Sequence, residues 1–397
     1  MSSKAQPLAV GVPKEIKTGE KRVSLSPASV KKMTQESISV FVESGAGEGC
    51  GFSDRMYVNS GATILDQHKD VWQKASLIVK VKEPQPEEFS LIQKKHILFS
   101  FLHLASKNES HLIKAIMKAK ATAIAFETVA NEKGETPLLK PMSEIAGQLS
   151  TYLACYINKK VKVRSGAIIY PSSFDKDLAA IQKNFPKLKY PAYDGKALIL
   201  GGGNVGLQIA LCLAQTKAHI WITEKDAPRQ REIKAYIQKH KMNMIVVDAQ
   251  DRSIPSLFEK ADMIFGTVYV VGRRAPILID QETLASSSHQ KKLIVDVAID
   301  QGGNVYGSHA TDCHDPVFID PFDNLRFGVT NIPTLCPIYA TKALEKVSFP
   351  YVMALAKNPK EAYSEFPELK SGVSLINGKV VNEEIAKIHK LLFETHR

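Results

Sequence analysis

Short apolar runs alternate with longer amphipathic segments through the first part of the chain. Runs of this length predict strands, and the segments between them predict helices. The expected strands are residues 8–12, 38–42, 77–81, 96–100 and 122–126, and the clearest expected helices are 26–36 and 109–119. Strands that alternate with helices are typical of a parallel, helix-covered sheet.

A second series of apolar runs follows a long predicted helix at residues 142–157. Its expected strands are 196–200, 220–224, 244–247, 263–265, 293–298 and 325–330. A helix at 338–355, a polar tail and a closing helix at 382–393 complete the chain. Two long helices bracket the second series, so we expect the C-terminal part to return to the first domain. The predicted class is α/β, with two Rossmann-like doubly wound parallel-sheet domains, residues 1–147 with 335–397 and residues 148–334.

A glycine motif, Gly201-x-Gly203-x-x-Gly206, joins the strand at 196–200 to a helix expected at 207–214. The three glycines allow a tight turn, close approach of a pyrophosphate and close packing of helix on strand. The next strand ends in Glu224, which would accept hydrogen bonds from ribose hydroxyls and repel a 2′-phosphate. Residues 148–334 are therefore predicted to bind NAD in preference to NADP, although Lys225 and Arg229 lie close enough to attract a phosphate.

Composition places the chain among ordinary globular proteins, with 44% hydrophobic and 23% charged residues. The N-terminus has no long apolar region, and no segment approaches the roughly 18 apolar residues that read as a membrane span. We expect a cytoplasmic protein. The net charge of +11 favours a solvated basic surface that gathers anionic ligands over a nucleic-acid surface, because no tract interleaves aromatic and basic residues.

The cysteines and histidines indicate no metal centre. The five cysteines are scattered and have no C-x-x-C spacing, so neither a disulfide framework nor a zinc site is expected. The segment 309–315 gathers His309, Asp312, Cys313, His314 and Asp315, but its spacing fits no common metal site.

Charged residues lie just past several predicted strands, where parallel α/β sheets place their ligands. Arg22, Lys82 and His103 follow strands of the first domain, and Asp300 follows a strand of the second. A guanidinium fork suits a carboxylate, and an imidazole exchanges protons near neutral pH. Each residue also has an ordinary structural interpretation: a surface or capping arginine, a lysine bridging to a carboxylate, a core histidine. We therefore expect the active site in the inter-domain cleft.

Several motifs together resemble the alanine dehydrogenase family, which includes the NAD-binding alpha subunit of proton-translocating nicotinamide nucleotide transhydrogenase. They are Gly11-x-Pro13-x-Glu15, Glu43-Ser-Gly-Ala-Gly47, Lys82-Glu-Pro84, Pro141-Met-Ser-Glu144 and Ile299-Asp-Gln-Gly-Gly303. The resemblance covers nearly the full length. The Lys82-Glu-Pro84 and His103 segments look like the dehydrogenase branch.

The resemblance implies roles for individual residues. Arg22 and Lys82 would bind the substrate carboxylate, and Lys82 also the keto oxygen. His103 would be the general acid/base and Asp300 would assist proton transfer, although Asp296 is a rival on the same predicted strand. The positions that match cofactor contacts are Ser143, Gly201, Gly203, Asn204, Val205, Gly206, Glu224, Arg229, Val268, Tyr269, Val297, Asp300, Val329, Asn331 and Ile332.

The activity that the resemblance implies is reversible, NAD-dependent oxidative deamination of L-alanine to pyruvate and ammonium by a homohexamer. The partners are then small molecules, with no membrane and no nucleic acid. Since deamination needs neutral His103, its rate is expected to rise with pH into the alkaline range.

Two segments, residues 168–194 and 335–340, depart from the family pattern and leave other functions open. A larger amino-acid substrate would make the protein an opine- or saccharopine-type dehydrogenase. A transhydrogenase alpha-like subunit would need a membrane partner. A catalytically silent NAD-binding or nucleic-acid-associated protein is the alternative from a different class.

Overall fold

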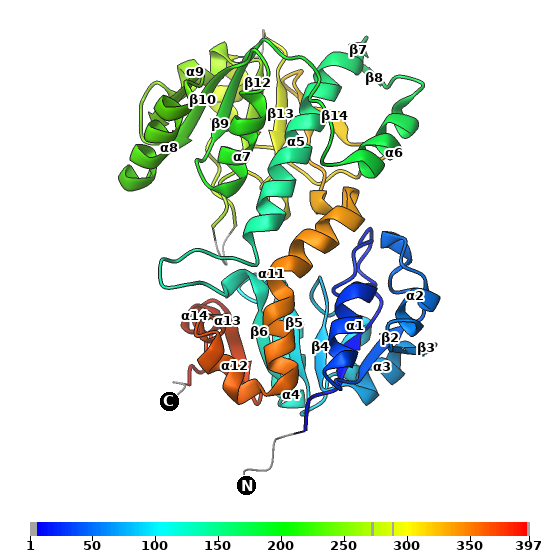
Figure 1. Cartoon of the computed structure of the whole chain (residues 1–397). Helices are drawn as coiled ribbons and strands as arrows, with labels where there is room; N and C mark the ends of the chain where they lie inside the picture. Colours follow the sequence, from blue (N-terminus) through cyan, green and yellow to red (C-terminus); the bar gives the residue numbers. More distant parts are fainter. Residues whose placement is uncertain (1–5, 271–273, 288–289, 395–397) are drawn as a thin grey trace. The chain divides into compact units, whose positions relative to one another are not determined.

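The computed structural model describes residues 6–270, 274–287 and 290–394 and divides the chain into two compact units. The first unit comprises Met1–Met142 and Pro337–Arg397, and the second comprises Ser143–Cys336. Each unit has a largely parallel sheet of its own with helices packed on it (Figure 1). The predicted α/β class with two Rossmann-like domains is confirmed, and Pro337–Arg397 belong to the first unit.

The sheet of the first unit has the order β17-β16-β6-β5-β4-β1-β2-β3. Its strands are β1 (Val10–Val12), β2 (Val40–Glu43), β3 (Thr63–Leu65), β4 (Leu77–Val79), β5 (Ile97–Ser100), β6 (Thr122–Ala125), β16 (Val373–Ile376) and β17 (Lys379–Val380). Strands β1 to β6 are parallel and follow the doubly wound order 3-2-1-4-5-6. All five predicted strands are present. The polar tail, for which no strand was predicted, contributes β16 and β17, which extend the sheet in antiparallel fashion.

Helices cover both faces of this sheet. They are α1 (Pro27–Gln35), α2 (Asp54–Val58), α3 (His68–Lys74), α4 (Ser110–Ala119), α11 (Pro337–Lys357), α12 (Pro359–Glu365), α13 (Leu369–Gly372) and α14 (Glu383–His389). Trp72 of α3, Ile116 of α4 and Ile385 of α14 share one apolar cluster with Leu98 of β5, while α1 and α11 lie in front of the sheet in Figure 1. Helix α14 ends well before the predicted residue 393 because Lys390 adopts a left-handed conformation.

The sheet of the second unit has the order β11-β10-β9-β12-β13-β15-β14. Its strands are β9 (Lys196–Leu200), β10 (His219–Glu224), β11 (Met244–Asp248), β12 (Met263–Gly266), β13 (Leu293–Asp296), β14 (Val317–Ile319) and β15 (Leu325–Phe327). All are parallel except β14, the antiparallel edge strand. The parallel strands again follow the order 3-2-1-4-5-6, in which ligands bind at the carboxyl ends where the order reverses.

The helices of the second unit are α5 (Lys140–Lys160), which begins in the first unit, α6 (Phe174–Asn184), α7 (Asn204–Leu213), α8 (Ala227–His240), α9 (Ile254–Lys260) and α10 (Gln281–Ser286). Phe258 of α9 and Leu284 of α10 pack on Leu198 and Ile264 from one face of the sheet. A small hairpin, β7 (Lys162–Arg164) with β8 (Ala167–Ile169), precedes α6. The polar and basic stretch at residues 175–194 thus contains a helix that the sequence pattern did not predict.

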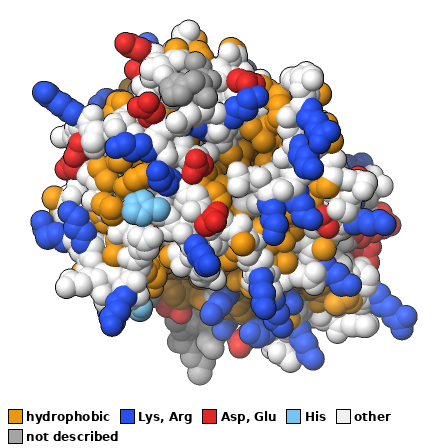
Figure 2. Space-filling model, turned by 90° about the horizontal axis from the view of Figure 1, so that it is seen from above, with side chains coloured by type: hydrophobic (Ala, Val, Ile, Leu, Met, Phe, Trp, Pro, Cys, Tyr) orange, Lys and Arg blue, Asp and Glu red, His pale blue; other side chains and the backbone are white. Residues whose placement is uncertain are grey.

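Across the residues that the structure describes, no helix combines the length and apolar character needed to cross a membrane. The surface reflects the composition instead. On the face drawn in Figure 2, Lys and Arg side chains are scattered widely and are more numerous than Asp and Glu. The excess positive charge of the chain is therefore visible at the surface.

Candidate active site

Charged residues fill the carboxyl ends of the central strands of the first unit. The order of this sheet reverses between β1 and β4, and such a reversal is where doubly wound sheets bind ligands. The loop after β1 carries Glu15, Glu20 and Arg22, and the segment after β4 carries Lys80 and Lys82.

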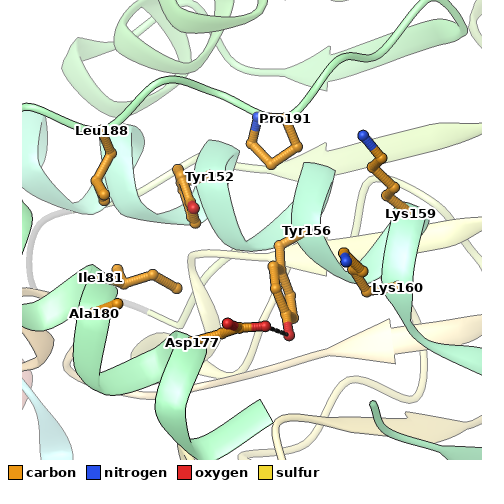
Figure 3. A pocket seen from close by; sticks show the side chains of 9 residues that line it. All are labelled: Tyr152, Tyr156, Lys159, Lys160, Asp177, Ala180, Ile181, Leu188 and Pro191. Atoms are coloured by element: carbon orange, nitrogen blue, oxygen red, sulfur yellow. Dashed lines mark hydrogen bonds between the residues drawn. The ribbon is translucent and has the colours of Figure 1, made fainter. Parts of the chain in front are cut away.

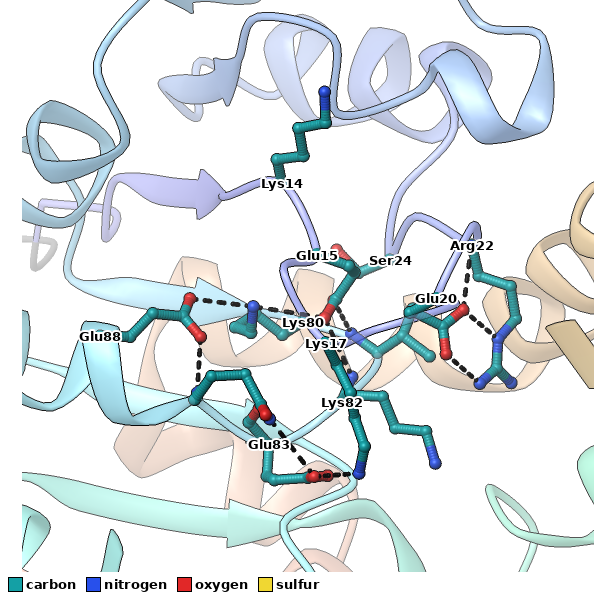
Figure 4. Close-up of polar contacts among 12 residues, drawn as sticks. Lys14, Glu15, Lys17, Glu20, Arg22, Ser24, Lys80, Lys82, Glu83 and Glu88 are labelled. Carbon is teal, nitrogen blue, oxygen red and sulfur yellow. Dashed lines mark hydrogen bonds and ion pairs between the residues drawn. The ribbon is translucent and has the colours of Figure 1, made fainter. Parts of the chain in front are cut away.

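A buried ion-pair cluster lies directly behind this edge (Figure 4). Lys80, only 1% exposed, places Nζ 3.2 Å from Oε2 of Glu15 and 3.0 Å from Oε1 of Glu88. Burial opposes the charge of Lys80, but the two carboxylates raise its pKa above the usual value. Burial also raises the pKa of Glu15 to about 7. The cluster keeps a lysine charged inside the protein because two carboxylates replace its water shell.

Glu15 connects this cluster to Lys82. Its Oε1 accepts a hydrogen bond from the backbone N of Val81 at 2.5 Å, and its Oε2 accepts one from the backbone N of Lys82 at 3.4 Å. Glu15 therefore fixes the backbone from which the Lys82 side chain projects. Glu15 was not among the residues predicted from the sequence to have a role in the site. The available signal was Lys80, a charged residue within a buried apolar run, which requires a carboxylate partner.

His68 extends the cluster toward the surface. Its Nε2 lies 3.1 Å from Oε1 of Glu88, and its Nδ1 lies 2.7 Å from Oε2 of Glu43. Although burial opposes its charge, the two carboxylates raise the pKa of His68 to about 9. The same Glu43 oxygen accepts a hydrogen bond from the backbone N of Lys14 at 2.6 Å. The loop after β1 is thereby held at both Lys14 and Glu15.

Arg22 is nearly inaccessible, and most of its guanidinium faces Glu20. Nε donates to Oε1 of Glu20 at 2.7 Å, and Nη2 donates to Oε2 at 2.6 Å. The exposed fractions of the two side chains are 2% and 0%. Nη1 donates to Sδ of Met142 at 3.1 Å. The bidentate fork that the sequence analysis reserved for a substrate carboxylate is thus formed with Glu20 in this structure.

His103 lies close enough to Lys82 and Arg22 for their charges to affect its pKa. Burial and the charge of Lys82 lower the pKa of His103 to about 3, with further lowering by Lys17 and Arg22 and an opposing contribution from Glu83. Lys17 and Glu83 form an ion pair. The structure therefore brings three predicted residues, Arg22, Lys82 and His103, to one edge of one sheet.

The low pKa corrects one expectation. We expected deamination to gain from the titration of His103 toward alkaline pH. With its pKa near 3, the imidazole is already neutral at pH 6, so this residue causes no alkaline rise in the free enzyme.

The backbone around His103 is itself constrained. His103 has a φ of +50°, and its backbone N donates to Oε1 of Glu127 at 2.6 Å. The imidazole stacks on Phe101, with ring centroids 6.1 Å apart and an interplanar angle of 12°. A left-handed conformation is uncommon for residues other than glycine and is found at functional sites when surrounding contacts maintain it. Glu127 and Phe101 supply those contacts here.

The corresponding edge of the second unit consists mainly of glycine and backbone. Gly201 turns the chain out of β9 with a φ of +109°. A Cβ on Gly206 would lie 1.9 Å from the carbonyl oxygen of Gly201, whereas a Cβ on Gly203 would meet nothing within 4 Å. Gly206 therefore permits close packing of α7, and Gly203 leaves open space before the first residue of that helix. This geometry fits a pyrophosphate at a helix N-terminus.

Glu224 lies beside this glycine loop at the end of β10. Its Oε1 accepts backbone hydrogen bonds from Lys225 at 2.8 Å and Asp226 at 2.9 Å. Its Oε2 would lie 2.8 Å from a Cβ on Gly202. Arg229 donates to the carbonyl oxygen of Gly202 at 3.3 Å and pairs with Glu232 at 2.9 Å. A carboxylate therefore flanks the loop, and the nearby arginine is already paired with an acid.

The other predicted cofactor contacts lie at the next strand ends. After β12, Val268 donates its backbone N to Oδ1 of Asn304 at 2.8 Å, and Tyr269 is 43% exposed. After β13, Val297 donates its backbone N to the carbonyl oxygen of Gly266 at 2.9 Å. The remaining positions are Ser143 in the first turn of α5, Asn204 and Val205 at the start of α7, and Val329 and Ile332 after β15. Asn304, which the sequence analysis did not single out, holds the Val268 segment.

Asp300 and Asp296 have different environments. Strand β13 ends at Asp296, and Asp300 lies in the 3-10 turn η5 (Ile299–Gln301), so the expectation that both lie on one strand was wrong. Asp296 is 1% exposed, and its Oδ2 accepts hydrogen bonds from Asn304 N at 2.7 Å and Ser308 Oγ at 2.6 Å. Asp300 is exposed, and its Oδ2 accepts a bond from the backbone N of Asn331 at 3.4 Å. Asp296 therefore has a structural role, because its hydrogen bonds hold Asn304 and Ser308, while the exposed Asp300 is accessible to a ligand.

The His, Asp and Cys side chains of residues 309–315 are not arranged as metal ligands. His309 stacks on Phe318 with ring centroids 3.6 Å apart, and Oδ1 of Asp312 accepts the backbone N–H groups of His314 and Asp315. Among the described residues, no group of three or more His, Cys, Asp or Glu is placed to hold a metal ion. The five cysteines are free thiols.

Two family models match this chain. The alanine dehydrogenase/PNT N-terminal domain matches residues 11–146, and the alanine dehydrogenase/PNT C-terminal domain matches residues 189–383. Residues 147–188 lie between the two matched segments.

Curated relatives and solved structures agree with these matches. The alanine dehydrogenase of Methanococcus maripaludis is 36% identical over 97% of both chains. That of Bacillus subtilis is 34% identical over 96% of this chain and 94% of its own. A solved L-alanine dehydrogenase has 33% identity and a TM-score of 0.78, covering 96% of this chain and 99% of its own. A transhydrogenase from Sinorhizobium meliloti has a TM-score of 0.70 at 20% identity over 94% of this chain and 99% of its own, a similarity of fold.

Proposed function

The chain belongs to the alanine dehydrogenase/PNT family, and from this premise we propose that it is an NAD-dependent L-alanine dehydrogenase. The reaction consumes L-alanine, NAD⁺ and water and yields pyruvate, ammonium, NADH and a proton. It is reversible. In this proposal residues 1–147 and 335–397 form the substrate domain, and residues 148–334 form the NAD-binding domain.

The observation that carries the proposal is the gathering of Arg22, Lys82 and His103 at the carboxyl edge of the first sheet, after the neighbouring strands β1, β4 and β5. A 2-oxo acid offers a carboxylate and a carbonyl oxygen, and two cations beside an imidazole match both groups. Lys82 binds the carboxylate and the developing carbonyl oxygen. Arg22 is the second proposed carboxylate ligand, through Nη1, the guanidinium nitrogen that donates to Met142 while Nε and Nη2 donate to Glu20.

His103 and Asp300 are the residues proposed to transfer protons. The ammonium group of L-alanine first loses the proton that the overall reaction releases, and loss of the Cα hydride from the free amine then leaves an iminium carbon. Water attacks this carbon, and neutral His103 accepts a proton from that water. The resulting carbinolamine then expels ammonia as a proton returns to nitrogen. Asp300 is the second residue that we propose to assist this proton transfer. Positive charge from Lys82 stabilises the oxyanion that develops at the substrate carbon.

The nicotinamide cofactor supplies the hydride acceptor. Its pyrophosphate would be bound at Gly201, Gly203 and Gly206, and its adenosine ribose at Glu224, which favours NAD over NADP. Ser143, Asn204, Val205, Arg229, Val268, Tyr269, Val297, Val329, Asn331 and Ile332 are the further proposed contacts. The ion pair of Arg229 with Glu232 supports NAD, because it reduces the positive charge that a 2′-phosphate would need.

We further propose that the enzyme is cytoplasmic, assembles as a homohexamer and serves L-alanine catabolism. These assignments rest on resemblance to the family. Gel filtration with light scattering would test the assembly, since a hexamer of 43.8 kDa chains is readily separated from a dimer.

A substrate panel tests the activity. Purified protein is assayed for NADH formation with L-alanine, D-alanine, glycine, L-serine and L-2-aminobutyrate. It is then assayed for NADH oxidation with pyruvate plus ammonium, and with pyruvate plus a second amino acid in place of ammonium. We expect the highest kcat/KM with L-alanine and with pyruvate plus ammonium. Preference for an amino acid in place of ammonium would instead identify an opine-type enzyme, and no turnover would contradict the proposal.

A further inference from the structure

Much of the net positive charge of the chain comes from one short segment. Residues 159–189 hold two acids, Asp175 and Asp177, and eight basic residues: Lys159, Lys160, Lys162, Arg164, Lys176, Lys183, Lys187 and Lys189. Their net charge of +6 compares with +11 for the whole chain. This concentration is unlike a uniformly solvated basic surface, and all of it except Lys189 falls in the stretch between the two matched family segments.

A pocket lies in this part of the second unit, between α5, α6 and the chain that follows α6. It has a volume of about 290 Å³, near the lower end of the roughly 300–1,000 Å³ usual for small-molecule sites. Figure 3 shows Tyr152 and Tyr156 on one face of α5, with Ile181 and Leu188 opposite them. The full lining is Tyr152, Tyr156, Lys159, Lys160, Asp177, Ala180, Ile181, Leu188 and Pro191.

Two kinds of polar group border the two tyrosines. Lys159 and Lys160 are exposed at the last turn of α5. Oδ2 of Asp177 accepts hydrogen bonds from Tyr156 Oη at 2.6 Å and Ser173 Oγ at 2.9 Å. The Tyr156 bond lowers the pKa of Asp177, so this carboxylate is charged and can also accept bonds from a ligand.

A second hollow adjoins the first. It is lined by Lys183, Asn184, Phe185, Pro186, Lys187, Leu188 and Lys189 and has a volume of about 530 Å³. The two share Leu188, so the hollow next to the aromatic pocket adds three lysines, Lys183, Lys187 and Lys189, to the surroundings. A ligand with an aromatic part in the first hollow would therefore carry its anionic part in a strongly positive environment.

We propose that this pocket binds a mononucleotide, separate from the dinucleotide at the glycine loop. The base packs on the half-buried Tyr152 ring, while the buried Tyr156 holds Asp177 in place. The ribose hydroxyls reach Asp177, and the phosphates are held by Lys159 and Lys160. Aromatic side chains accept any base by stacking, and a carboxylate that binds ribose is the device found in dinucleotide sites. The pocket is short and bounded by α5 and α6, so it accommodates a single base, whereas a nucleic-acid strand requires a continuous groove.

The test measures ATP binding to full-length enzyme saturated with NADH, so that the dinucleotide site is already filled. Isothermal titration calorimetry should show one ATP per chain with a Kd below about 1 mM. Adenosine carries only the base and ribose, and tripolyphosphate carries only the phosphates. Each should bind at least about tenfold more weakly than ATP. Absence of ATP binding in this range overturns the proposal.

Variants assign the binding to this pocket. The double substitution Lys159→Ala with Lys160→Ala, and separately Tyr152→Ala, should weaken ATP binding at least about tenfold, the effect of one lost charge-assisted or stacking contact. The control is Lys239→Ala with Lys260→Ala, which removes two exposed lysines from the ends of α8 and α9 and should leave the Kd unchanged. L-Alanine turnover without ATP should stay at the wild-type level in all three variants, which shows that they fold.

Three other outcomes contradict the proposal. Equal affinity for tripolyphosphate and ATP would indicate surface charge alone. An oligonucleotide that binds more tightly than ATP, and that Tyr152→Ala does not affect, would indicate a nucleic-acid surface. Equal weakening by the control pair would place ATP elsewhere on the second unit.

Discussion

The two units build the same sheet and fill its binding edge in opposite ways. Both place six parallel strands in the order 3-2-1-4-5-6 and add antiparallel strands at one edge. At the switch point of the first unit the chain presents charged side chains, among them Glu15, Lys80, Lys82 and Arg22. At the switch point of the second it presents Gly201, Gly203 and Gly206.

The difference follows from the ligands that the two edges are proposed to hold. A small oxo acid carries its charge on a few atoms, so binding it requires side-chain cations, and buried cations require carboxylates beside them. A dinucleotide pyrophosphate is bound by backbone N–H groups at a helix N-terminus, and any Cβ there competes with it for space. One topology can thus present either kind of ligand site, depending on the residues that follow its central strands.

The largest expected effect concerns the stability of the charged edge. Glu20→Ala leaves the buried Arg22 guanidinium without its carboxylate, which should reduce the free energy of unfolding by about 3–5 kcal/mol. The matched change at the other edge, Glu232→Ala, breaks the exposed pair with Arg229 and should cost about 0–1 kcal/mol. Urea denaturation of both variants measures the contrast. Equal losses would mean that the Glu20–Arg22 pair is no more important than a surface pair.

The next effect concerns catalysis. His103→Ala should reduce kcat for L-alanine at least about a hundredfold, the usual minimum for a lost general acid/base, while the NADH dissociation constant stays unchanged. Stopped-flow turnover and fluorescence titration measure the two quantities. A variant that retains most of its turnover would leave Asp300 or Lys82 as the proton carrier.

The pH behaviour of His103 sharpens that result. Because burial and Lys82 lower its pKa to about 3, the free enzyme should contain neutral His103 throughout pH 5–9, a range in which an unperturbed imidazole titrates near 6.5. NMR titration of ring-labelled enzyme, with His103→Gln to assign the signal, should show no midpoint for this residue between pH 5 and 9. Lys82→Met should move its midpoint upward. A wild-type midpoint near 6.5 would contradict the account of this edge.

A smaller effect is expected at the cofactor edge. Glu224→Ala should shift the ratio of kcat/KM for NAD to that for NADP toward NADP by about tenfold, because it removes a charged acceptor and a repulsion. Asp248→Ala is the control, since Asp248 lies opposite Glu224 on the neighbouring strand β11. If both variants shift the ratio equally, general surface charge rather than Glu224 selects the cofactor.

The sequence predicted the elements that have a regular pattern of buried residues. It missed the elements that form because of contacts with other parts of the fold. The buried parallel strands and the glycine loop were found because their patterns are local. Strand β3 is short and partly exposed, and β16 forms only because it pairs with β6. Helix α6 lies in a stretch whose polarity masked the buried positions Phe174, Leu178 and Ile181.

The candidate site shows the same limit. The residue types at strand ends indicated Arg22, Lys82, His103 and Asp300. The ion pairs and pKa values of these side chains, however, depend on loop conformation and on residues elsewhere in the chain. The Glu20 pair of Arg22 and the low pKa of His103 arise from three-dimensional packing, which periodicity does not encode. The choice between Asp296 and Asp300 depended on where β13 ends.

The central claim, that one edge binds the substrate and the other binds the cofactor, is tested most directly by a crossed measurement on Lys82→Ala and Gly203→Ala. Both should fold, since a Cβ on Gly203 meets nothing within 4 Å. The account predicts that Lys82→Ala raises KM for pyruvate or lowers kcat at least about tenfold with NADH affinity unchanged. Gly203→Ala should weaken NADH binding by a similar factor, because its Cβ occupies the space left for the pyrophosphate. Loss of NADH affinity in Lys82→Ala, or wild-type NADH affinity in Gly203→Ala, would contradict the division of labour between the two sheets.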